Sequence, residues 1–421
     1  MAATTETVAD VCRRARAASL ALPGVPTAAK DAALTALARL LRERTGEVLA
    51  ANRVDVAGGH EAGLDDALID RLRLDEERVE AMAVGVEAVI ALADPVGELL
   101  ERRTLASGIE MEHRRVPIGV VAIVYEARPN VTVDAAALCL KSGNAAVLRG
   151  SSSAAASNAV LVELVREAAA EAGLPEGAVE AVAGGGRAEL GELARQRDLV
   201  DLIIPRGGEG LKAALEEVAA VPILYAASGN CHVYVDAAAD LGMARDIAYN
   251  AKVQRPGVCN AAETLLVHAA VADELLPALL GDLDAAGVEL VGDERARANA
   301  GAVAVAPATD DDWDREYHGL KMAVGVVDSV GDAIAHVNRH GSGHSEAIVT
   351  ASEEAGRAFT SGVDAACVYV NASTRFTDGF EFGMGAEIGN STQKLHARGP
   401  IGLRELTSTK YVLRGTGQTR G

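Results

Sequence analysis

Cys259 stands in a polar loop whose composition suits a nucleophile. The loop spans residues 254–260, with the sequence Gln-Arg-Pro-Gly-Val-Cys-Asn, and it comes immediately ahead of an apolar segment that predicts a strand. A neighbouring cation such as Arg255 favours the thiolate, which is the reactive form of cysteine. Most free cysteines are small buried hydrophobes, and this interpretation suits three others, Cys12, Cys139 and Cys367. Cys259 is therefore the candidate nucleophile.

A cysteine paired with a histidine is the rival mechanism for such a nucleophile. Among the nine histidines, the best placed is His344, within Gly-Ser-Gly-His-Ser-Glu at residues 341–346. Segments that predict helices, a hairpin or strand ends contain four others, which we interpret as structural: His60, His113, His268 and His336. No cluster of histidines and cysteines has the spacing of metal ligands, so the sequence predicts no metal site.

A serine cluster follows one of the predicted strands, in a position where an anionic ligand could bind. Ligands of open α/β sheets bind where the strands end in loops. Arg149 and Gly150 end the strand, and Ser151, Ser152 and Ser153 follow it. A phosphate could use the cation, the hydroxyls and the amides at the start of the next helix. Taken alone, the cluster is more simply a serine-rich helix cap.

Two further strand exits are rich in glycine, which lets the backbone approach a ligand closely. One is the run Gly184-Gly185-Gly186, and the other contains Arg206 and Gly207. Neither matches the G-x-G-x-x-G pattern of dinucleotide sites, and taken alone each is better explained as an ordinary loop.

The intervening segments predict the elements that must position these residues. Residues 5–93 are rich in Ala and Leu with charges at helical spacing, which predicts a run of amphipathic helices. Residues 102–115 alternate around a Ser-Gly pair and predict a hairpin, whereas the apolar run 118–125 predicts a strand buried on both faces. Helices then alternate with strands: we expect helices at 133–141, 154–172 and 187–195, and strands at 145–149, 179–183 and 199–205.

A second alternating series begins at Asp240. Its expected strands lie at 264–268, 303–306, 323–327, 347–350 and 367–370. Alternation of this kind is typical of doubly wound parallel sheets. The sequence therefore predicts two α/β domains, with their boundary near residues 225–240.

Length and charge narrow the class of protein. A chain of 421 residues and 43.3 kDa exceeds the size of most single cores. A net charge of −20 and a pI near 4.9 argue against nucleic acids and anionic membranes as partners. Five cysteines without paired spacing exclude a disulfide framework. The longest apolar stretch is far shorter than the roughly 20 residues of a membrane-spanning helix, and no signal peptide is evident. We expect a cytoplasmic protein.

Several segments, taken in order, resemble the gamma-glutamyl phosphate reductase family of the aldehyde dehydrogenase superfamily. The resemblance covers nearly the whole chain. Its blocks lie at residues 117–132, 254–260, 340–348, 371–389 and 394–400. The last two blocks are the most specific to this family.

This resemblance implies an α/β fold of the aldehyde dehydrogenase type. Such a fold has a Rossmann-type cofactor domain, an α/β catalytic domain and a small oligomerisation element. We expect the NADP-binding domain to comprise residues 1–104, 116–230 and about 366–385. The catalytic domain with Cys259 then spans residues 231–365, and the oligomerisation hairpin and tail comprise residues 105–115 and 386–421.

The resemblance also implies roles for individual residues. Cys259 matches the catalytic cysteine, and Asn130 matches an asparagine that holds the oxyanion. Arg149 stands where the superfamily often has a lysine near the cofactor, and Glu316 resembles a glutamate that contacts the nicotinamide ribose. The other expected cofactor contacts are Ser151, Ser152, Gly186, Arg206 and Gly207. Arg128, Arg255, His344 and Arg375 are the expected substrate contacts, with ion pairs that anchor loops as the alternative role of the arginines.

One departure from the superfamily concerns water. Hydrolytic aldehyde dehydrogenases keep a glutamate before a Gly-Gly pair, where this chain has Tyr-Ala-Ala-Ser-Gly-Asn at residues 225–230. The general base that would activate water is therefore missing. Its absence is consistent with exchange of phosphate, rather than attack of water, at the thioester.

The implied activity is NADPH-dependent reduction of L-glutamyl 5-phosphate to L-glutamate 5-semialdehyde and phosphate, the second step of proline biosynthesis from glutamate. NADPH is favoured over NADH because Arg149 and the serines form a turn without an acidic residue. We expect a separate glutamate 5-kinase to supply this small-molecule substrate, and we expect a homo-oligomer. The alternatives are a related enzyme that uses another semialdehyde or acyl donor, and a non-catalytic scaffold, against which Asn130, Cys259 and Glu316 argue together.

Overall fold

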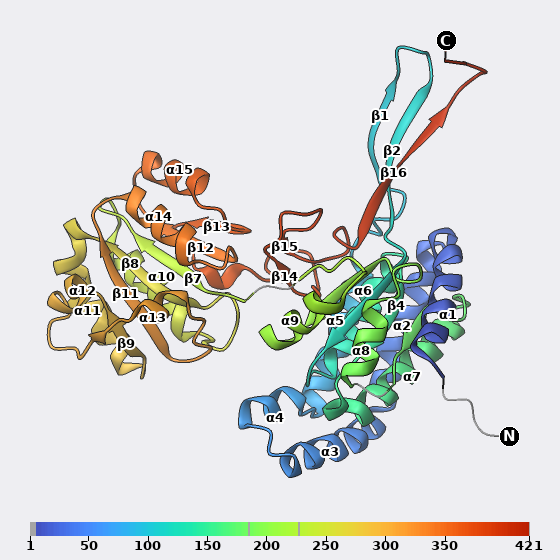
Figure 1. The fold of residues 1–421 in the computed structure, drawn as a ribbon, viewed down its shortest axis with the longest axis horizontal. Coiled ribbons are helices and arrows are strands. Elements are labelled where there is room, and N and C mark those ends of the chain that lie inside the picture. The colour runs from blue at the N-terminus through green and yellow to red at the C-terminus, as the bar shows by residue number, and fades with distance from the viewer. Residues whose placement is uncertain (1–5, 184–185, 226–227, 421) are drawn as a thin grey trace. The chain divides into compact units, whose positions relative to one another are not determined.

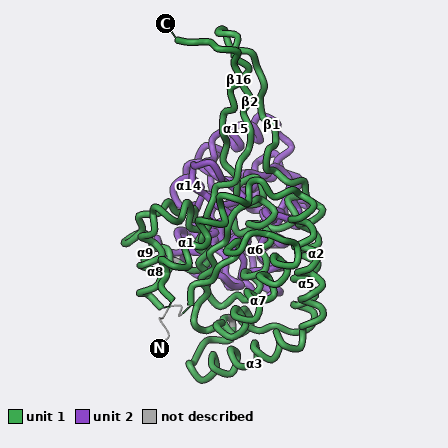
Figure 2. The backbone as a smooth tube through the Cα atoms, turned by 90° about the vertical axis from the view of Figure 1, so that its right-hand side faces the viewer, with its two compact units in different colours: residues 1–226, 383–389, 401–421 green, residues 227–382, 390–400 purple. Residues whose placement is uncertain are grey.

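The computed structural model describes three stretches of the chain, residues 6–183, 186–225 and 228–420. Two compact units make up the fold, shown in separate colours in Figure 2. Unit 1 comprises residues 1–226, 383–389 and 401–421, and unit 2 comprises residues 227–382 and 390–400. The predicted glycine-rich strand exit at residues 184–186 lies partly outside the described residues, because Gly184 and Gly185 are not described. The same holds for the segment 225–230, in which Ala226 and Ala227 are not described.

Unit 1 is built on a parallel sheet in the strand order β5-β4-β3-β6. Its strands are β3 (Val120–Tyr125), β4 (Ala145–Arg149), β5 (Val179–Ala181) and β6 (Leu202–Arg206). Every residue of β3 and β4 is buried. This confirms the prediction of a central strand covered on both faces, as the crossover helices of a parallel sheet require.

Helices surround this sheet, as the amphipathic pattern of residues 5–93 predicts. They are α1 (Val8–Ala21), α2 (Thr27–Glu43), α3 (Thr45–Glu61), α4 (Asp66–Leu72), α5 (Glu76–Ile90), α6 (Asn130–Lys141), α7 (Ala155–Glu171), α8 (Arg187–Ala194) and α9 (Glu209–Val218). α6 contacts α7, and α1 contacts α8. Along the chain, β3, β4 and β5 follow one another in one direction across the sheet, and the connection to β6 runs in the opposite direction. Because crossover connections are right-handed, this reversal places α8 on the face of the sheet opposite α6 and α7.

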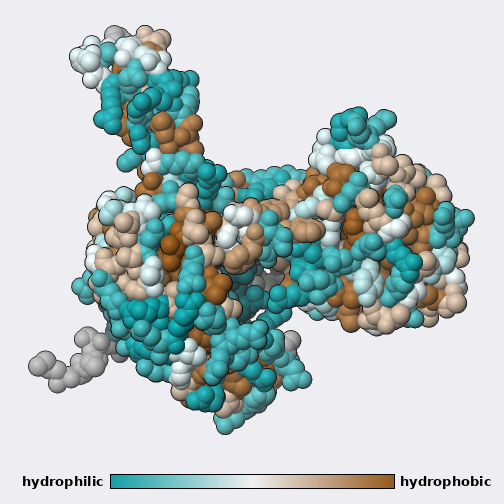
Figure 3. Space-filling model, turned by 180° about the vertical axis from the view of Figure 1, so that it is seen from behind, coloured by the Kyte–Doolittle hydropathy of each residue, from teal (hydrophilic) through white to brown (hydrophobic). Residues whose placement is uncertain are grey.

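A three-stranded antiparallel sheet extends from the helices of unit 1 (Figure 1). It consists of β1 (Leu99–Thr104), β2 (Glu110–Pro117) and β16 (Thr407–Arg414), in the order β1-β2-β16. The predicted hairpin is therefore confirmed, and the chain's C-terminal part supplies its third strand. The rings of His113 and Tyr411 stack across β2 and β16 at 4.4 Å. Figure 3 shows hydrophilic residues over much of this sheet, with apolar residues among them.

Unit 2 contains a seven-stranded parallel sheet in the order β10-β9-β11-β8-β7-β12-β13. The strands are β7 (Cys231–Val235), β8 (Ala262–His268), β9 (Glu289–Gly292), β10 (Ala306–Pro307), β11 (Lys321–Val327), β12 (Ser345–Val349) and β13 (Cys367–Val370). The expected strand at 303–306 is only the two-residue β10. The prediction omitted β9, whose four residues are too few to show a clear periodicity.

The helices of unit 2 cover both faces of this sheet. They are α10 (Leu241–Val253), α11 (Ala269–Ala285), α12 (Glu294–Ala298), α13 (Asp310–Asp314), α14 (Val330–His340) and α15 (Glu353–Gly362). A short antiparallel pair, β14 (Asn390–Ser391) and β15 (Gly399–Pro400), completes the unit. No helix among the described residues combines the length and the low polarity that crossing a membrane requires.

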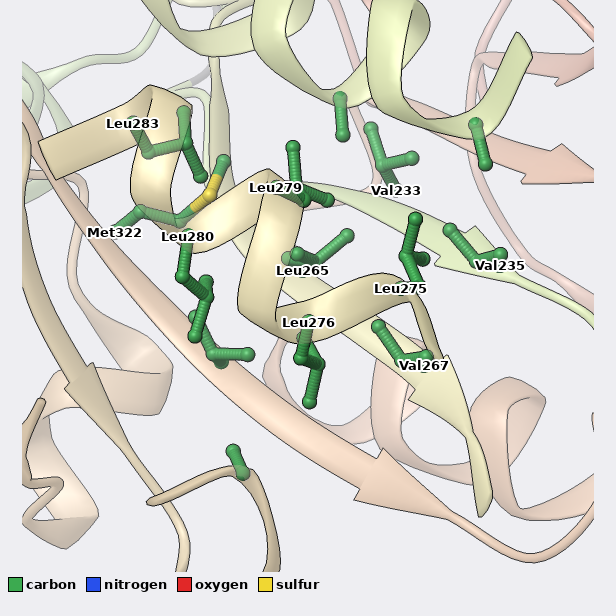
Figure 4. Close-up of a cluster of buried hydrophobic side chains, with 14 of the residues drawn as sticks. Val233, Val235, Leu265, Val267, Leu275, Leu276, Leu279, Leu280, Leu283 and Met322 are labelled. Carbon is green, nitrogen blue, oxygen red and sulfur yellow. The ribbon is translucent and has the colours of Figure 1, made fainter. Parts of the chain in front are cut away.

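Alternate residues of the central strands serve two separate cores. Leu265 and Val267 of β8 pack with the leucines of α11 on one face (Figure 4). Leu266, between them, packs on the other face with Phe359 of α15 and Val337 of α14. Side chains of a strand point to opposite faces in turn, so a continuous apolar run is needed to fill both cores.

The expected domain boundaries differ from the two units in three places. Residues 228–230, expected with the cofactor domain, and residues 390–400, expected with the oligomerisation tail, lie in unit 2. Residues 366–385 were expected with the cofactor domain, but residues 366–382 lie in unit 2. The reason is strand pairing: β13 pairs in parallel with β12, which makes it the edge of the unit 2 sheet. Only residues 383–385 of this segment belong to unit 1.

Candidate active site

The loop that contains Cys259 connects α10 to β8 and is held by a short helical turn, Thr374–Phe376. The Asn260 side-chain amide donates to the carbonyl oxygens of Arg375, at 3.3 Å, and Thr377, at 2.8 Å. In return, the Thr374 hydroxyl donates to the carbonyl of Asn260 at 2.7 Å. These bonds fix the backbone next to Cys259, whose side chain is half-buried. A nucleophile needs both this fixed position and access to substrate.

Residues 229–231 form the other support of the nucleophile. The Cys231 thiol donates to the Cys259 carbonyl at 3.2 Å. Asn230 donates from its side-chain amide to the carbonyls of Trp313 and His340, at 2.7 and 2.8 Å. Gly229 lies so close to Cys259 that an added Cβ would stand 1.6 Å from the Cys259 carbonyl oxygen. The position behind the nucleophile therefore admits only glycine.

This contact predicts a large effect for Gly229→Ala. The methyl group must displace the Cys259 backbone, and a shift of about 1 Å at a reacting group costs on the order of 10²-fold in rate. We expect kcat of the reaction at Cys259 to fall by about that factor. Gly281→Ala is the matched control, because the added Cβ meets nothing within 4 Å in α11. Equal kcat values for the two variants would contradict the steric argument.

Two of the predicted substrate-binding arginines are close to Cys259: Arg255 belongs to this loop, and Arg375 lies beside it. Arg375 donates from Nε to the Gln254 side-chain oxygen at 2.8 Å. Partial burial, and then the positive charge of Arg255, lower the pKa of Arg375, whereas the Cys259 thiolate acts in the opposite direction. Arg255 itself is exposed. The two guanidinium groups therefore give the surroundings of Cys259 a positive potential, which favours a thiolate and an anionic substrate.

His344 lies behind the nucleophile rather than on an open surface. Its side chain is fully buried, with Nδ1 2.8 Å from the Ser345 hydroxyl and 3.9 Å from the Cys231 sulfur. The structure therefore places Cys231 in contact with both His344 and the Cys259 backbone. A histidine in this position can reach a substrate only through its neighbours.

Glu316 precedes β11 and faces a group of buried charges. His318, with a φ of 55°, brings its Nε2 to 3.3 Å from one Glu316 oxygen, and the other oxygen, Oε1, has no hydrogen-bond partner. Lys252 and Glu263 form a fully buried ion pair at 2.5 Å nearby. Burial raises the pKa of Glu263 to about 7, opposed by Lys252. The unpartnered, buried oxygen of Glu316 can accept a hydrogen bond, such as one from a ribose hydroxyl.

Asn130 is the first residue of α6 in unit 1. Its side-chain amide donates to Asp134 at 3.0 Å, one helical turn further along the chain. Burial raises the pKa of Asp134 to about 6, against the opposing effects of Asn130 and Arg206. Asp134 therefore orients the Asn130 amide and leaves the second amide hydrogen for another acceptor. Ala127, at a φ of 43°, turns the chain from β3 into the half-buried Arg128 and then into this helix.

A cavity of about 500 Å³ opens at the carboxyl ends of β4 and β5. Ser151 and Ser152, two of the predicted cofactor contacts, line it. Arg149 is 5% exposed and donates from Nη2 to the Gly186 carbonyl at 2.6 Å. This hydrogen bond joins two strand exits. Arg206 ends β6 and is half-buried, and the adjoining exposed Gly207 packs on the Glu126 carboxylate.

The predicted residues thus form two groups. Unit 1 gathers its group at the carboxyl ends of its strands, where α/β ligands commonly bind. In unit 2, the loops with Cys259, His344 and Glu316 precede β8, β12 and β11, at the amino ends of the strands. Among the described residues, no group of three or more His, Cys, Asp or Glu side chains could hold a metal ion.

Comparisons with known proteins identify the family. The pattern of the aldehyde dehydrogenase family matches residues 1–311. The gamma-glutamyl phosphate reductases of Thermobifida fusca and Syntrophomonas wolfei are 54% and 51% identical to this chain, over 98% and 97% of both sequences. A solved gamma-glutamyl phosphate reductase from Thermotoga maritima is 46% identical, with a TM-score of 0.96 over 99% of this chain and 100% of that one. The chain belongs to the gamma-glutamyl phosphate reductase family.

The family and fold expected from the sequence blocks are therefore confirmed. An acetylating aldehyde dehydrogenase from Geobacillus thermoglucosidasius, only 19% identical, shares the fold with a TM-score of 0.69, over 98% of this chain and 97% of that one. The sequence alone did not indicate the structural roles of Asn230, Asn260 and the ion pair Lys252–Glu263. A charged Glu263 at the start of an otherwise apolar strand was the available signal, because buried carboxylates require a partner.

Proposed function

We propose that the chain reduces L-glutamyl 5-phosphate to L-glutamate 5-semialdehyde and phosphate, with NADPH as reductant and a thioester on Cys259 as intermediate. Identity above 50% along nearly the full length to gamma-glutamyl phosphate reductases supports the reaction. The observation that carries the residue assignment is Cys259, half-buried in a fixed loop beside Arg255 and Arg375.

In the first step the Cys259 thiolate attacks the acyl carbon of the substrate, and the phosphate leaves. The Asn130 amide and a backbone N–H near Cys259 hold the oxyanion that forms. Arg255 and Arg375 bind the phosphate or the substrate carboxylate, and Arg128 contributes from unit 1. His344 acts through Cys231, whose thiol it approaches, and so contributes to the position of the nucleophile rather than to its deprotonation.

Resolution of the thioester needs no activated water. The chain has no glutamate at residues 225–230 to serve as the base for hydrolysis. The thioester therefore persists until reduction gives a thiohemiacetal, which collapses to the aldehyde and returns Cys259 as the thiolate. In the opposite direction phosphate attacks the thioester and regenerates the acyl phosphate.

The aldehyde dehydrogenase family uses nicotinamide cofactors, which supply or accept hydride when bound. The residues of this chain fit such a molecule in two places. The cavity at β4 and β5 has about 500 Å³, within the range of small-molecule sites, and Glu316 has a carboxylate oxygen without a partner. We assign Ser151, Ser152, Gly186, Arg206 and Gly207 to the phosphates and ribose of the cofactor, with Arg149 as the cation beneath them.

The preference for NADPH predicts the result of Ser152→Glu. This exposed serine lines the cavity, and a carboxylate there repels a 2′-phosphate but can accept from a free 2′-hydroxyl. We expect the KM for NADP+ to rise at least about tenfold, with no such rise for NAD+. Ser361→Glu, on the exposed side of α15, is the matched control. If both cofactors respond equally, Ser152 does not face the 2′ position.

The proposal also covers the assembly of subunits and the source of the acyl phosphate substrate. The three-stranded sheet of β1, β2 and β16 exposes Leu99, Leu100, Tyr411 and Leu413, and we propose that it pairs subunits in a homo-oligomer. The domain roles follow from the two units, with cofactor binding in unit 1 and the nucleophile in unit 2. An acyl phosphate hydrolyses readily, so a separate glutamate 5-kinase must deliver it close to the time of use. We place the protein in the cytoplasm with that enzyme.

The reverse reaction tests this function without an unstable substrate. Glutamate 5-semialdehyde, NADP+ and phosphate are mixed with the protein, and NADPH is followed by absorbance. We expect formation of NADPH to require phosphate, because phosphate releases the acyl group from Cys259. Equal rates with and without phosphate would show hydrolysis and overturn the proposal.

A further inference from the structure

A second cavity lies in unit 2. It has a volume of about 410 Å³ and no role in the steps above. Its wall comes from three parts of the chain: residues 337–346 around the end of α14, Asp364 before β13, and residues 392–398 of the C-terminal segment. The loop 341–343 and Asp364 precede β12 and β13, so the cavity lies at the amino ends of the strands. The Cys259 loop precedes β8 at the same edge of this sheet.

Three buried polar atoms in this wall have no hydrogen-bond partner: Ser342 Oγ, Glu346 Oε1 and Arg398 Nε. Glu346 is fully buried, and its other oxygen accepts from the His232 amide at 2.7 Å. A buried polar group without a partner costs free energy, roughly 1–3 kcal/mol each. A polar ligand in this cavity can supply the missing bonds to all three atoms.

Gly341 lies directly against the buried Glu346 carboxyl group at the wall. An added Cβ at this position would lie 2.9 Å from Glu346 Oε1 and 2.6 Å from the Val337 carbonyl oxygen. Any larger residue would therefore cover the unpartnered oxygen. Its φ of −68° is one that any residue can adopt. A glycine is therefore required here by the close approach of these atoms and not by the backbone conformation.

The charges around the cavity have both signs. Arg398 binds Asp364 through Nη2 at 2.7 Å, and Lys394 pairs with the second oxygen of the same carboxylate. These two cations, Lys394 first, hold the pKa of Asp364 below its ordinary value. Both cations retain donors that Asp364 does not use, since Lys has three and Arg has five. A phosphate dianion would have to approach the Asp364 carboxylate, whereas a zwitterion finds a partner for each of its charges. Burial raises the pKa of Glu346, and an ammonium group beside it would favour its charged form.

We propose that this cavity binds an α-amino-acid head group. Its carboxylate accepts from Arg398 Nε, Lys394 and the Ser342 hydroxyl, and its ammonium group donates to Glu346 Oε1 and Asp364. The head group has two possible sources: the glutamyl substrate itself, in which case the inference rests on the proposed function, or a free amino acid that acts as an effector.

Calorimetric titration of the full-length protein, without cofactor or turnover, tests the site. The probes are L-glutamate, glutarate, which lacks the amino group, and 4-aminobutyrate, which lacks the α-carboxylate. We expect L-glutamate to bind at least tenfold more tightly than either analogue. Equal affinity for glutarate would exclude recognition of the ammonium group and overturn the proposal.

Two variants locate the binding. Arg398→Met removes a donor to the carboxylate and should weaken L-glutamate at least tenfold, whereas Arg357→Met removes an exposed cation of α15 and should change nothing. Ser342→Ala removes a hydroxyl that has no partner in the protein, so we expect unchanged or higher thermal stability together with a several-fold weaker affinity. If both cavity variants bind L-glutamate as the wild type does, the site is wrong.

Reverse-reaction kinetics separate the two sources. If the head group is that of the substrate, L-glutamate competes with glutamate 5-semialdehyde, and both cavity variants raise KM more than they lower kcat. If it is a free effector, L-glutamate changes the rate without competing, and the variants abolish that change. Turnover without phosphate would overturn the proposed function alone, because the calorimetric result does not depend on it.

Discussion

Cys259→Ala is expected to abolish the phosphate-dependent formation of NADPH from glutamate 5-semialdehyde. Without the thiolate no thioester forms, and the remaining residues can only hold the substrate. Loss of a covalent nucleophile lowers kcat by about 10⁴-fold or more in enzymes of this kind. The measurement is the rate of NADPH absorbance at saturating phosphate, with a thermal unfolding curve to establish that the variant is folded.

The matched control is Cys367→Ala. This cysteine is buried in β13 of the same unit, and its replacement removes the same atom without touching the Cys259 loop. We expect it to keep most of its kcat/KM, with some loss of stability from the vacated volume. Residual activity above 1% in Cys259→Ala would mean that another group carries the acyl intermediate.

Asn130→Ala has the second-largest expected effect. One preorganised donor to an oxyanion contributes about 10²–10³-fold to kcat, and the Asn130 amide is oriented for such a role by Asp134 at 3.0 Å. We expect kcat in the reverse reaction to fall by that factor, with a smaller change in the KM for semialdehyde. The donor acts on charge that develops only in the transition state, so ground-state binding is less affected.

Asn299→Ala provides the comparison for this variant. Its side-chain amide donates to the carbonyl of Arg295, four residues earlier on α12, so its loss changes a local helix contact alone. A reduction of kcat by less than about fivefold in Asn130→Ala would argue that the oxyanion is held by backbone amides near Cys259 without help from unit 1.

Much of the fold followed from local patterns in the sequence. The uninterrupted apolar run of β3 predicted a strand buried on both faces, because it must fill a core above and below the sheet. The alternation of residues 102–115 around a Ser-Gly pair predicted the β1–β2 hairpin. The expectation failed where elements were short, as at β9, or where strand pairing moved β13 into unit 2.

In the candidate site, too, the sequence indicated one part and not the rest. Cys259 stood out from its own neighbours in the sequence, since a cysteine in a polar loop beside a cation is unusual for a core residue. Its supports did not stand out. Cys231 and Gly229 lie about thirty residues before it, and Arg375 lies 121 residues beyond Gln254, with which it bonds. No local pattern marks such partners.

The sequence by itself indicated the types of the long elements, the candidate nucleophile and the family, because periodicity, composition and short motifs are properties of neighbouring residues. The tertiary structure decided which loops share an edge of a sheet. β7 lies between β8 and β12 in space but precedes both along the chain, and this order alone joins Cys231, Cys259 and His344. The same packing assembles the charged cavity of Glu346, Asp364 and Arg398, since contacts between distant segments depend on strand order, which local sequence does not encode.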